Sequence, residues 1–100
     1  MNINFYLLDA KKSANTLRSV YLVCYLKNRQ LRYNTGIHVL ATQWNTKKMR
    51  VISHKEKNIL NGKLDDLAAI ARDFEDTLPL TEKPTQEAFK NFFWVKLKLI

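Results

Sequence analysis

Residues 30–39 read QLRYNTGIHV, a stretch in which apolar and polar side chains alternate. Successive side chains of a β-strand point to opposite faces, so this period of two predicts a strand. One face collects the apolar residues Leu31, Tyr33, Ile37 and Val39. The other face collects the polar residues Gln30, Arg32, Asn34 and His38. We expect the apolar face to be buried and look for function on the polar one.

Two earlier segments alternate in the same way and predict two further strands. The first has its inward residues at Ile3, Phe5 and Leu7. The second has its inward residues at Val20, Leu22, Cys24 and Leu26, and its outward residues at Tyr21, Val23 and Tyr25. Residues 27–30 form the next turn, where Asn28 can adopt a positive φ, and a tight hairpin there leads to the third strand. Within that third strand, Gly36 is expected to allow a bulge or a close backbone approach.

A three-stranded antiparallel sheet with one apolar face needs a cover, and the following segment predicts one. Ser53 and Glu56 have the spacing of a helix capping box. Beyond them an apolar stripe recurs every three or four residues, at Leu60, Leu64, Leu67, Ala71, Phe74 and Leu78. Gly62 lies inside this helix and costs about 1 kcal/mol relative to Ala, so the first turns are its weakest part. Trp44 is expected to plug one end of the core.

A second helix is expected after the two prolines of residues 79–84. Thr85 suits its N-cap and Glu87 suits its first turn. Its apolar positions are Phe89, Phe92, Phe93 and Val95. Two alternatives stay open, because this helix either begins a further domain or folds back onto the sheet and the first helix. The predicted class is therefore α+β, a three-stranded antiparallel β-sheet packed on one α-helix, then a linker and the start of a further helix.

Length and charge narrow the class of protein. One hundred residues, 46% of them hydrophobic, favour a single domain with a modest core. The net charge is +8, and it is unevenly placed: residues 1–57 hold 11 basic and 2 acidic residues, and residues 58–100 hold 6 and 7. The strand-rich residues 1–57 thus carry a net charge of +9, and residues 58–100 carry a net charge of −1. This is the pattern of a surface that meets phosphates, although a generally basic, solvated domain is the plainer alternative.

Other classes of function find no support in the sequence. The lone Cys24 allows no internal disulfide, cysteine zinc site or redox pair, and it favours a reducing compartment. No apolar run reaches the roughly 18 residues that span a bilayer, so we expect a cytoplasmic protein without a membrane partner. His38 and His54 have no neighbours at metal-ligand spacing. We find no nucleophile–base pair and no cofactor motif, and so expect no enzyme activity, metal, cofactor or small-molecule substrate.

The polar face of the sheet has the chemistry for reading duplex DNA. A major groove admits a β-ribbon or a small sheet, whose outward side chains then reach the base edges. Arg32 can donate two hydrogen bonds to guanine, and Asn34 can pair with adenine. Asn4, Tyr6, Tyr21, Tyr25 and His38 share this face. Tyr21 and Tyr25 could contact sugars or phosphates, and their plainer alternative is cross-strand support of the sheet.

Loop cations supply the predicted phosphate contacts, which give affinity without reading sequence. They are Lys11, Lys12, Lys27, Arg29, Lys47, Lys48 and Arg50. Each of them could instead be an ordinary solubilising residue.

Several motifs in this order resemble the N-terminal arm-DNA-binding domain of tyrosine recombinases, the integrases of Bacteroidetes-type mobile elements. They are Ile3-Asn4-Phe5-Tyr6-Leu7, Val20-Tyr21-Leu22, Arg32-Tyr33-Asn34-Thr35-Gly36-Ile37, Trp44-Asn45, and Leu60-Asn61 with Leu64. The resemblance implies a sheet backed by a helix that enters the major groove at arm-type sites of double-stranded DNA. It also implies other recombinase subunits as further partners. No counterpart of the recombinase catalytic residues is found here, so the resemblance implies no strand cleavage by this segment.

The domain organisation expected from the resemblance has three parts. Residues 1–78 form the arm-DNA-binding domain, residues 79–84 the linker, and residues 85–100 the start of a core-binding helical domain. Two other functions stay open beside DNA binding: a protein–protein interaction module that docks through the aromatic second helix, and single-stranded RNA binding by the tyrosines of the sheet.

Overall fold

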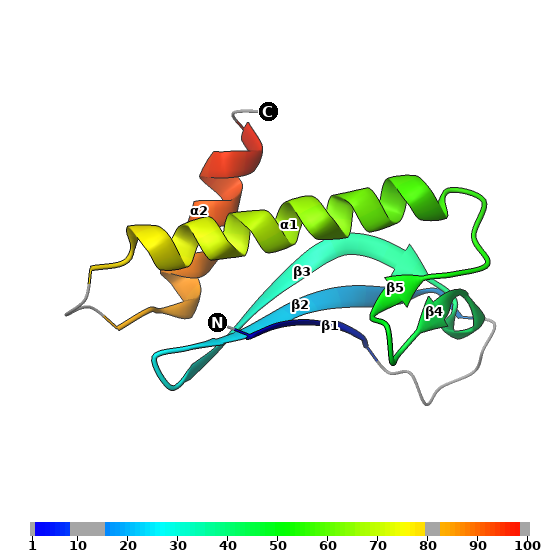
Figure 1. Ribbon diagram of the computed structural model, residues 1–100, viewed down its shortest axis with the longest axis horizontal. Coiled ribbons are helices and arrows are strands. Elements are labelled where there is room, and N and C mark those ends of the chain that lie inside the picture. Colours follow the sequence, from blue (N-terminus) through cyan, green and yellow to red (C-terminus); the bar gives the residue numbers. More distant parts are fainter. Residues whose placement is uncertain (1, 9–15, 80–82, 99–100) are drawn as a thin grey trace.

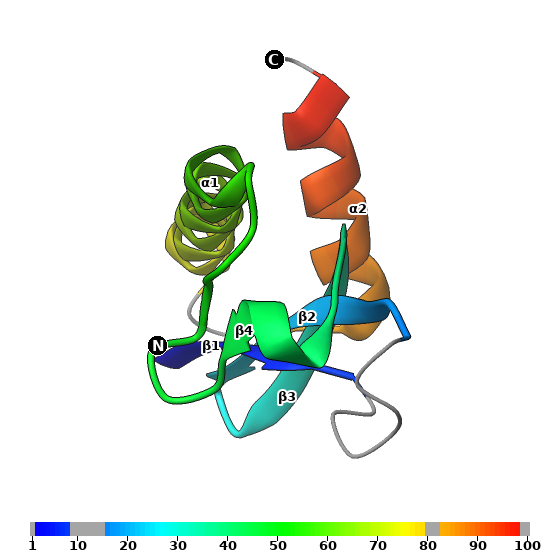
Figure 2. The same ribbon diagram turned by 90° about the vertical axis from the view of Figure 1, so that its right-hand side faces the viewer.

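The computed structural model describes residues 2–8, 16–79 and 83–98. The elements in chain order are β1 (Asn2–Leu7), β2 (Arg18–Leu26), β3 (Arg29–Val39), the short 3-10 helix η1 (Ala41–Gln43), β4 (Trp44–Asn45), β5 (Arg50–Val51), α1 (Lys57–Thr77) and α2 (Gln86–Lys98). Figure 1 shows the three long strands as one layer with α1 running along it. Figure 2 shows that α1 and α2 both lie on the same side of the sheet. The predicted α+β class is confirmed.

The sheet is an antiparallel meander in the order β1-β2-β3. Its register pairs Phe5 with Leu22, and Leu22 with Tyr33, so the predicted inward residues of the strands share one face. The hairpin between β2 and β3 turns over two residues, shorter than the four we expected. Lys27 (φ 50°) and Asn28 (φ 66°) both have positive φ, which is the type I′ geometry that matches the twist of the flanking strands.

A bulge interrupts the pairing of β2 with β3. Ser19 lies opposite His38 but Tyr21 lies opposite Asn34, so one residue of β2 faces three residues of β3. Gly36 sits in the bulge with φ 78°, as the sequence predicts. The bulge inserts two residues, which is one full side-chain period of a strand, and the faces therefore stay in phase on both sides of it.

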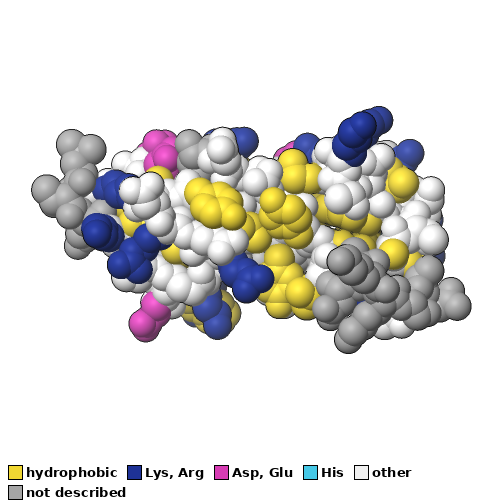
Figure 3. Space-filling view, turned by 90° about the horizontal axis from the view of Figure 1, so that it is seen from below, with side chains coloured by type: hydrophobic (Ala, Val, Ile, Leu, Met, Phe, Trp, Pro, Cys, Tyr) yellow, Lys and Arg dark blue, Asp and Glu magenta, His cyan; other side chains and the backbone are white. Residues whose placement is uncertain are grey.

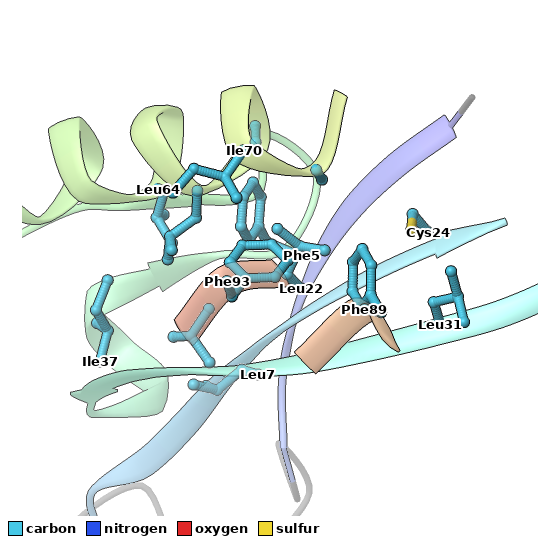
Figure 4. Packing of buried hydrophobic residues seen from close by; sticks show 14 of the residues in the cluster. Phe5, Leu7, Leu22, Cys24, Leu31, Ile37, Leu64, Ile70, Phe89 and Phe93 are labelled. Carbon is cyan, nitrogen blue, oxygen red and sulfur yellow. The ribbon is translucent and has the colours of Figure 1, made fainter. Parts of the chain in front are cut away.

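The core lies between the sheet and the two helices. From α1 it receives Leu64, Leu67, Ala68, Ile70, Ala71 and Phe74, which include most of the predicted stripe. Trp44 is buried at one end, as expected. From α2 come Phe89 and Phe93, both completely buried, and Figure 4 shows them in the same interior as Leu22, Leu31 and Leu64. The rings of Phe93 and Tyr33 stack with centroids 4.0 Å apart.

The predicted capping box at the start of α1 is wrong. The helix begins at Lys57, and its N-cap residue, Glu56, makes no side-chain cap hydrogen bond. Ser53 has φ 54°, a turn conformation between β5 and α1. The Glu56 amide instead donates to Nδ1 of His54, at 3.0 Å. The turn needed to redirect the chain after β5 therefore overrides the local capping signal.

The second helix folds back onto the sheet and α1, which is one of the two alternatives left open by the sequence. Thr85 caps it as predicted, because its Oγ1 accepts a hydrogen bond from the Ala88 amide at 3.1 Å. Its buried residues, Phe89 and Phe93, belong to the same core as the sheet. The predicted boundary at residue 78 and the continuation into a core-binding domain stay predictions.

Two side-chain amides complete strand edges that lack a neighbouring strand. The Gln86 carboxamide accepts from the Arg32 amide at 2.9 Å and donates to the Arg32 carbonyl. In the same way, Asn61 of α1 accepts from the Val51 amide at 2.8 Å and donates to the Val51 carbonyl at 3.1 Å. Each of these pairings, called an amide bridge below, reproduces the two bonds of an adjacent strand and fixes a helix to a strand edge.

Candidate nucleic-acid interface

No described helix or strand covers the face of the sheet turned away from the helices, and the side chains of this face stand in cross-strand rows. The antiparallel register aligns three such rows, because directly paired residues point to the same face. They are Asn2–Tyr25–Gln30, Asn4–Val23–Arg32 and Tyr6–Tyr21–Asn34. The structure thus brings together on this outer face the residues that the sequence assigns to DNA reading.

The middle of the outer face is apolar. Val23 points outward, yet only 4% of it is exposed, because it lies at the bottom of a shallow hollow of about 250 Å³. Tyr6, Leu8 and Tyr25 border this hollow and are about half exposed. Figure 3 looks onto this face and shows hydrophobic side chains along its middle, with Lys and Arg side chains toward the end where the β2–β3 hairpin lies. The outer face therefore combines an apolar centre with polar and cationic margins.

Arg32 is the best-placed of the predicted base readers. Its side chain is exposed, and its Cζ lies 6.0 Å from the centroid of the Tyr21 ring. Its backbone is held by the amide bridge to Gln86. A guanidinium on a fixed backbone beside an aromatic ring has fewer conformations to lose when it binds, which favours specific contacts.

Asn34 is exposed but partly engaged. Its Oδ1 accepts a hydrogen bond from the Gly36 amide at 3.0 Å, which helps to shape the bulge. The acceptor half of the predicted pairing with adenine thus already has one partner, whereas the Nδ2 donor lies on the exposed side chain.

Tyr21, Tyr25 and His38 differ in how exposed their side chains are. Tyr25 is 51% exposed, and its hydroxyl accepts a hydrogen bond from Nε2 of Gln30 at 3.3 Å. Tyr21 is half-buried under Arg32, and His38 is exposed in the row with Ser19. Tyr25 and His38 are therefore the more accessible of the three.

The predicted phosphate contacts separate into accessible and engaged side chains. Arg29 at the hairpin and Lys47 and Lys48 in the turn between β4 and β5 are exposed. Lys27 is also exposed, and its Nζ donates to the carbonyl of Pro79 at 2.7 Å. Lys11 and Lys12 lie outside the described residues.

Arg50 is the predicted contact that is most turned away from the outer face. Its Nη2 forms an ion pair with Asp65 of α1 at 2.6 Å, and its Nη1 donates to the Asn61 carbonyl at 3.3 Å. These contacts point its guanidinium toward the helix, and its predicted role in DNA binding stays untested.

Acidic residues are confined to the helical side of the described chain. Residues 2–8 and 16–51, which form all five strands, contain seven basic residues and no acidic one. Helix α1 contains three basic and five acidic residues. Five of these seven basic residues, Lys27, Arg29, Arg32, Lys47 and Lys48, are exposed. The strands and their turns are therefore positive, whereas α1 is slightly negative.

Other chemistry has little support in the part of the chain that the structure describes. There, no group of three or more His, Cys, Asp or Glu side chains is placed to hold a metal ion, and no helix is long and apolar enough to cross a membrane. Burial, with a smaller contribution from the charge of Glu75, raises the pKa of the Cys24 thiol to about 11. A thiol with so high a pKa is a poor nucleophile at neutral pH.

Two residues beside the outer face were missed by the sequence analysis. Gln86 and Lys90 of α2 lie next to Arg32 and Asn34, around a second hollow at the β3 edge. The periodicity of the sequence places them on a helix but gives no signal of where that helix docks.

Comparison with known proteins gives one match. A family model described as an arm DNA-binding domain matches residues 5–90. The searches of curated proteins and of solved structures found no match. The matched range runs from β1 into α2 and includes the outward residues of the three strands from Tyr6 onward, as well as Gln86 and Lys90.

Proposed function

The chain belongs to the arm DNA-binding domain family, the N-terminal DNA-binding modules of tyrosine recombinases, and from this premise we propose that its outer face binds duplex DNA sequence-specifically. The module would act within a recombinase of a mobile element, in DNA integration and recombination, by binding arm-type sites. It would contribute DNA binding and no catalytic residue.

One observation carries the proposal: the outer face aligns three strands of outward side chains without an acidic residue among those described. Strands in a sheet are spaced about 4.8 Å apart, so three strands span about 10 Å between the outer two. A major groove is about 12 Å wide, and it accepts a layer of this width. The apolar centre around Val23 and Tyr25 suits contact with thymine methyl groups and sugars.

The proposed roles follow from position. Arg32 reads guanine, Asn34 donates to a base acceptor through Nδ2, and His38 and Tyr25 contact bases or sugars nearby. Lys27 and Arg29 contact phosphates at the hairpin end of the sheet, and Lys47 and Lys48 contact them beside the β1 edge. Lys11, Lys12, Tyr21 and Arg50 remain candidates for further contacts.

The test is a titration with duplex DNA over a range of salt concentrations. Each phosphate contact adds about −0.9 to the slope of log affinity against log salt, so the four proposed lysine and arginine contacts give a slope of about −3.6. Duplexes enriched by selection from a random pool should bind more tightly than scrambled ones. A flat salt profile, or equal affinity for both kinds of duplex, would contradict the proposal.

Two variants separate the reading of bases from the binding of phosphates. Arg32→Ala should lower the discrimination between selected and scrambled duplexes, by roughly 1–3 kcal/mol if the contact is bidentate. Lys47→Ala should weaken both duplexes equally and make the salt slope shallower by about 0.9. An Arg32 variant that keeps full discrimination would show that the outer face is not the reading surface.

A second candidate function, docking of a protein partner, is favoured by the end of α2. Trp94, Val95 and Leu97 are 62%, 54% and 41% exposed, an unusual apolar content for a free helix surface. Other recombinase subunits are the partners we propose. Trp94→Ala should disrupt their assembly and leave DNA binding unchanged. Substitution of Phe93 does not test this idea, because Phe93 lies in the core.

A further inference from the structure

An open hollow of about 450 Å³ lies where the β3 edge meets α2. Its lining combines two cations, two amides and two phenol rings, from Arg32, Lys90, Asn34, Gln86, Tyr21 and Tyr33. Among the residues that the structure describes, no acidic side chain lines it. Cations with neutral hydrogen-bond donors and without a carboxylate are the composition of an anion site.

We propose that this hollow binds a DNA backbone phosphate through Lys90, so that the DNA-binding surface continues around the β3 edge onto α2. This inference rests on the proposed function. It adds to the outer face a residue on the second helix, in a segment that the sequence analysis assigns to a different domain.

The width of the sheet supports this position for a phosphate. A three-stranded sheet nearly fills a major groove, so each edge strand runs beside one wall of the groove, where the phosphates lie. The β1 edge is covered by the turn between β4 and β5, because the Phe5 amide donates to Sδ of Met49 at 3.4 Å and Lys48 lies beside it. Lys90 occupies the corresponding place beyond the β3 edge. Lys48 and Lys90 thus lie beyond opposite edges of the sheet.

The amide bridge gives Lys90 a fixed position relative to the outer face. Gln86 binds the backbone of Arg32, and Lys90 lies one helical turn further along α2. Four residues of a helix bring two side chains to the same face, so Gln86 and Lys90 both turn toward β3. Phe89 and Phe93, which are completely buried, hold the helix against the sheet.

Glu87 opposes the proposed site and provides a test of the opposite sign. It lies between Gln86 and Lys90 in the sequence, is exposed, and does not line the hollow. Its negative charge on the same turn of α2 would repel a nearby phosphate. Glu87→Gln should therefore strengthen the binding of all duplexes, with a larger gain at low salt than at high salt.

The experiment compares Lys90→Ala with the full chain, using a mixed-sequence duplex of about 20 base pairs, long enough for two helical turns. Loss of one phosphate contact should make the salt slope shallower by about 0.9, so that the ratio of wild-type to variant affinity falls about 3.5-fold between about 50 and about 200 mM salt. Discrimination between selected and scrambled duplexes should not change. Thermal unfolding would verify that this exposed substitution leaves the fold intact.

Lys96→Ala is the matched control. Lys96 is on the same helix, and its Nζ lies 5.4 Å from the centroid of the Phe92 ring, away from the hollow, so its removal should leave the salt slope unchanged. If the wild type is salt-dependent and Lys90→Ala has the same salt slope, the phosphate site is overturned. The proposed DNA binding by the outer face is not affected by that result. If Lys90→Ala and Lys96→Ala make the salt slope shallower by the same amount, the phosphate site is also overturned, since the loss of one positive charge would then explain the effect. A wild type without salt dependence overturns the proposed function itself.

Discussion

Gln86 forms with the backbone of Arg32 the two hydrogen bonds that a fourth strand would form with β3. The bridge covers part of an exposed strand edge and ties α2 to the residue that is the leading candidate for base reading. Sheet edges left open invite pairing with other chains, so this side chain also protects β3.

Removing the bridge should loosen Arg32 locally. In Gln86→Ala, we expect the Arg32 amide to exchange its hydrogen faster and the protein to lose roughly 1–2 kcal/mol of stability, at about 1 kcal/mol for each net hydrogen bond. Hydrogen exchange followed by NMR measures the first effect and urea unfolding the second. Asn61→Ala is the control, because it removes the equivalent bridge at Val51 and should accelerate exchange there only. Unchanged exchange at Arg32 in Gln86→Ala would contradict the expectation.

The two glycines should respond to alanine with opposite signs. Gly36 has φ 78°, and a Cβ added there would meet no atom within 4 Å, so Gly36→Ala should cost about 1–2 kcal/mol from backbone strain alone. Gly62 is helical with equally open surroundings, so Gly62→Ala should stabilise the protein by up to about 1 kcal/mol. Chemical denaturation of both variants measures the difference. A stabilising Gly36→Ala would show that the bulge relaxes without cost.

Neighbouring aromatics of α2 should differ sharply in their effect on stability. Phe93 is completely buried and stacks on Tyr33, so Phe93→Ala should cost roughly 3–5 kcal/mol. Trp94 is 62% exposed, and Trp94→Ala should change stability by no more than about 0.5 kcal/mol. Urea unfolding of both variants provides the comparison. Equal, small effects would mean that α2 does not share the core of the sheet in solution.

Cys24 should make stability fall at alkaline pH. Burial first, and then the charge of Glu75, raise its pKa from 9.0 to about 11 in the folded protein. Between these values the unfolded chain loses the thiol proton while the folded chain keeps it, so stability that is complete below pH 9 declines as the pH rises toward 11. The difference in unfolding free energy between wild type and Cys24→Ala, followed from pH 9.0 to about 11, isolates this thiol from the tyrosines and lysines. A constant difference across that range would count against the burial of the thiol.

Local periodicity was enough to predict most of the fold. The alternation in β1, β2 and β3 and the apolar stripe of α1 depend on neighbours two to four residues apart, which a sequence displays directly. Asn28 and Gly36 were predictable for a similar reason, since few residue types favour a positive φ. The capping box failed because the chain must also turn between Val51 and Lys57, and that demand comes from the tertiary structure.

The candidate site was predictable only where it follows the strands. Arg32, Asn34 and His38 share a face because of strand geometry, and the structure places them there. The engagement of Arg50 with Asp65, and the approach of Gln86 and Lys90 to β3, join segments far apart in the chain. Such contacts depend on where a helix docks, and no pattern within the helix encodes that position.

The separation of charge between the strands and α1 has a consequence for how the protein meets its partner. Five exposed basic residues with no acidic one on the described strands and their turns, against a net −2 on α1, give the molecule an electric dipole directed from α1 toward the sheet. In the field of a polyanion such a dipole experiences a torque, which would rotate the molecule until the sheet leads. Encounters would then begin with the sheet already facing the polyanion. The association rate constant, rather than the dissociation rate constant, would therefore carry much of the dependence on ionic strength.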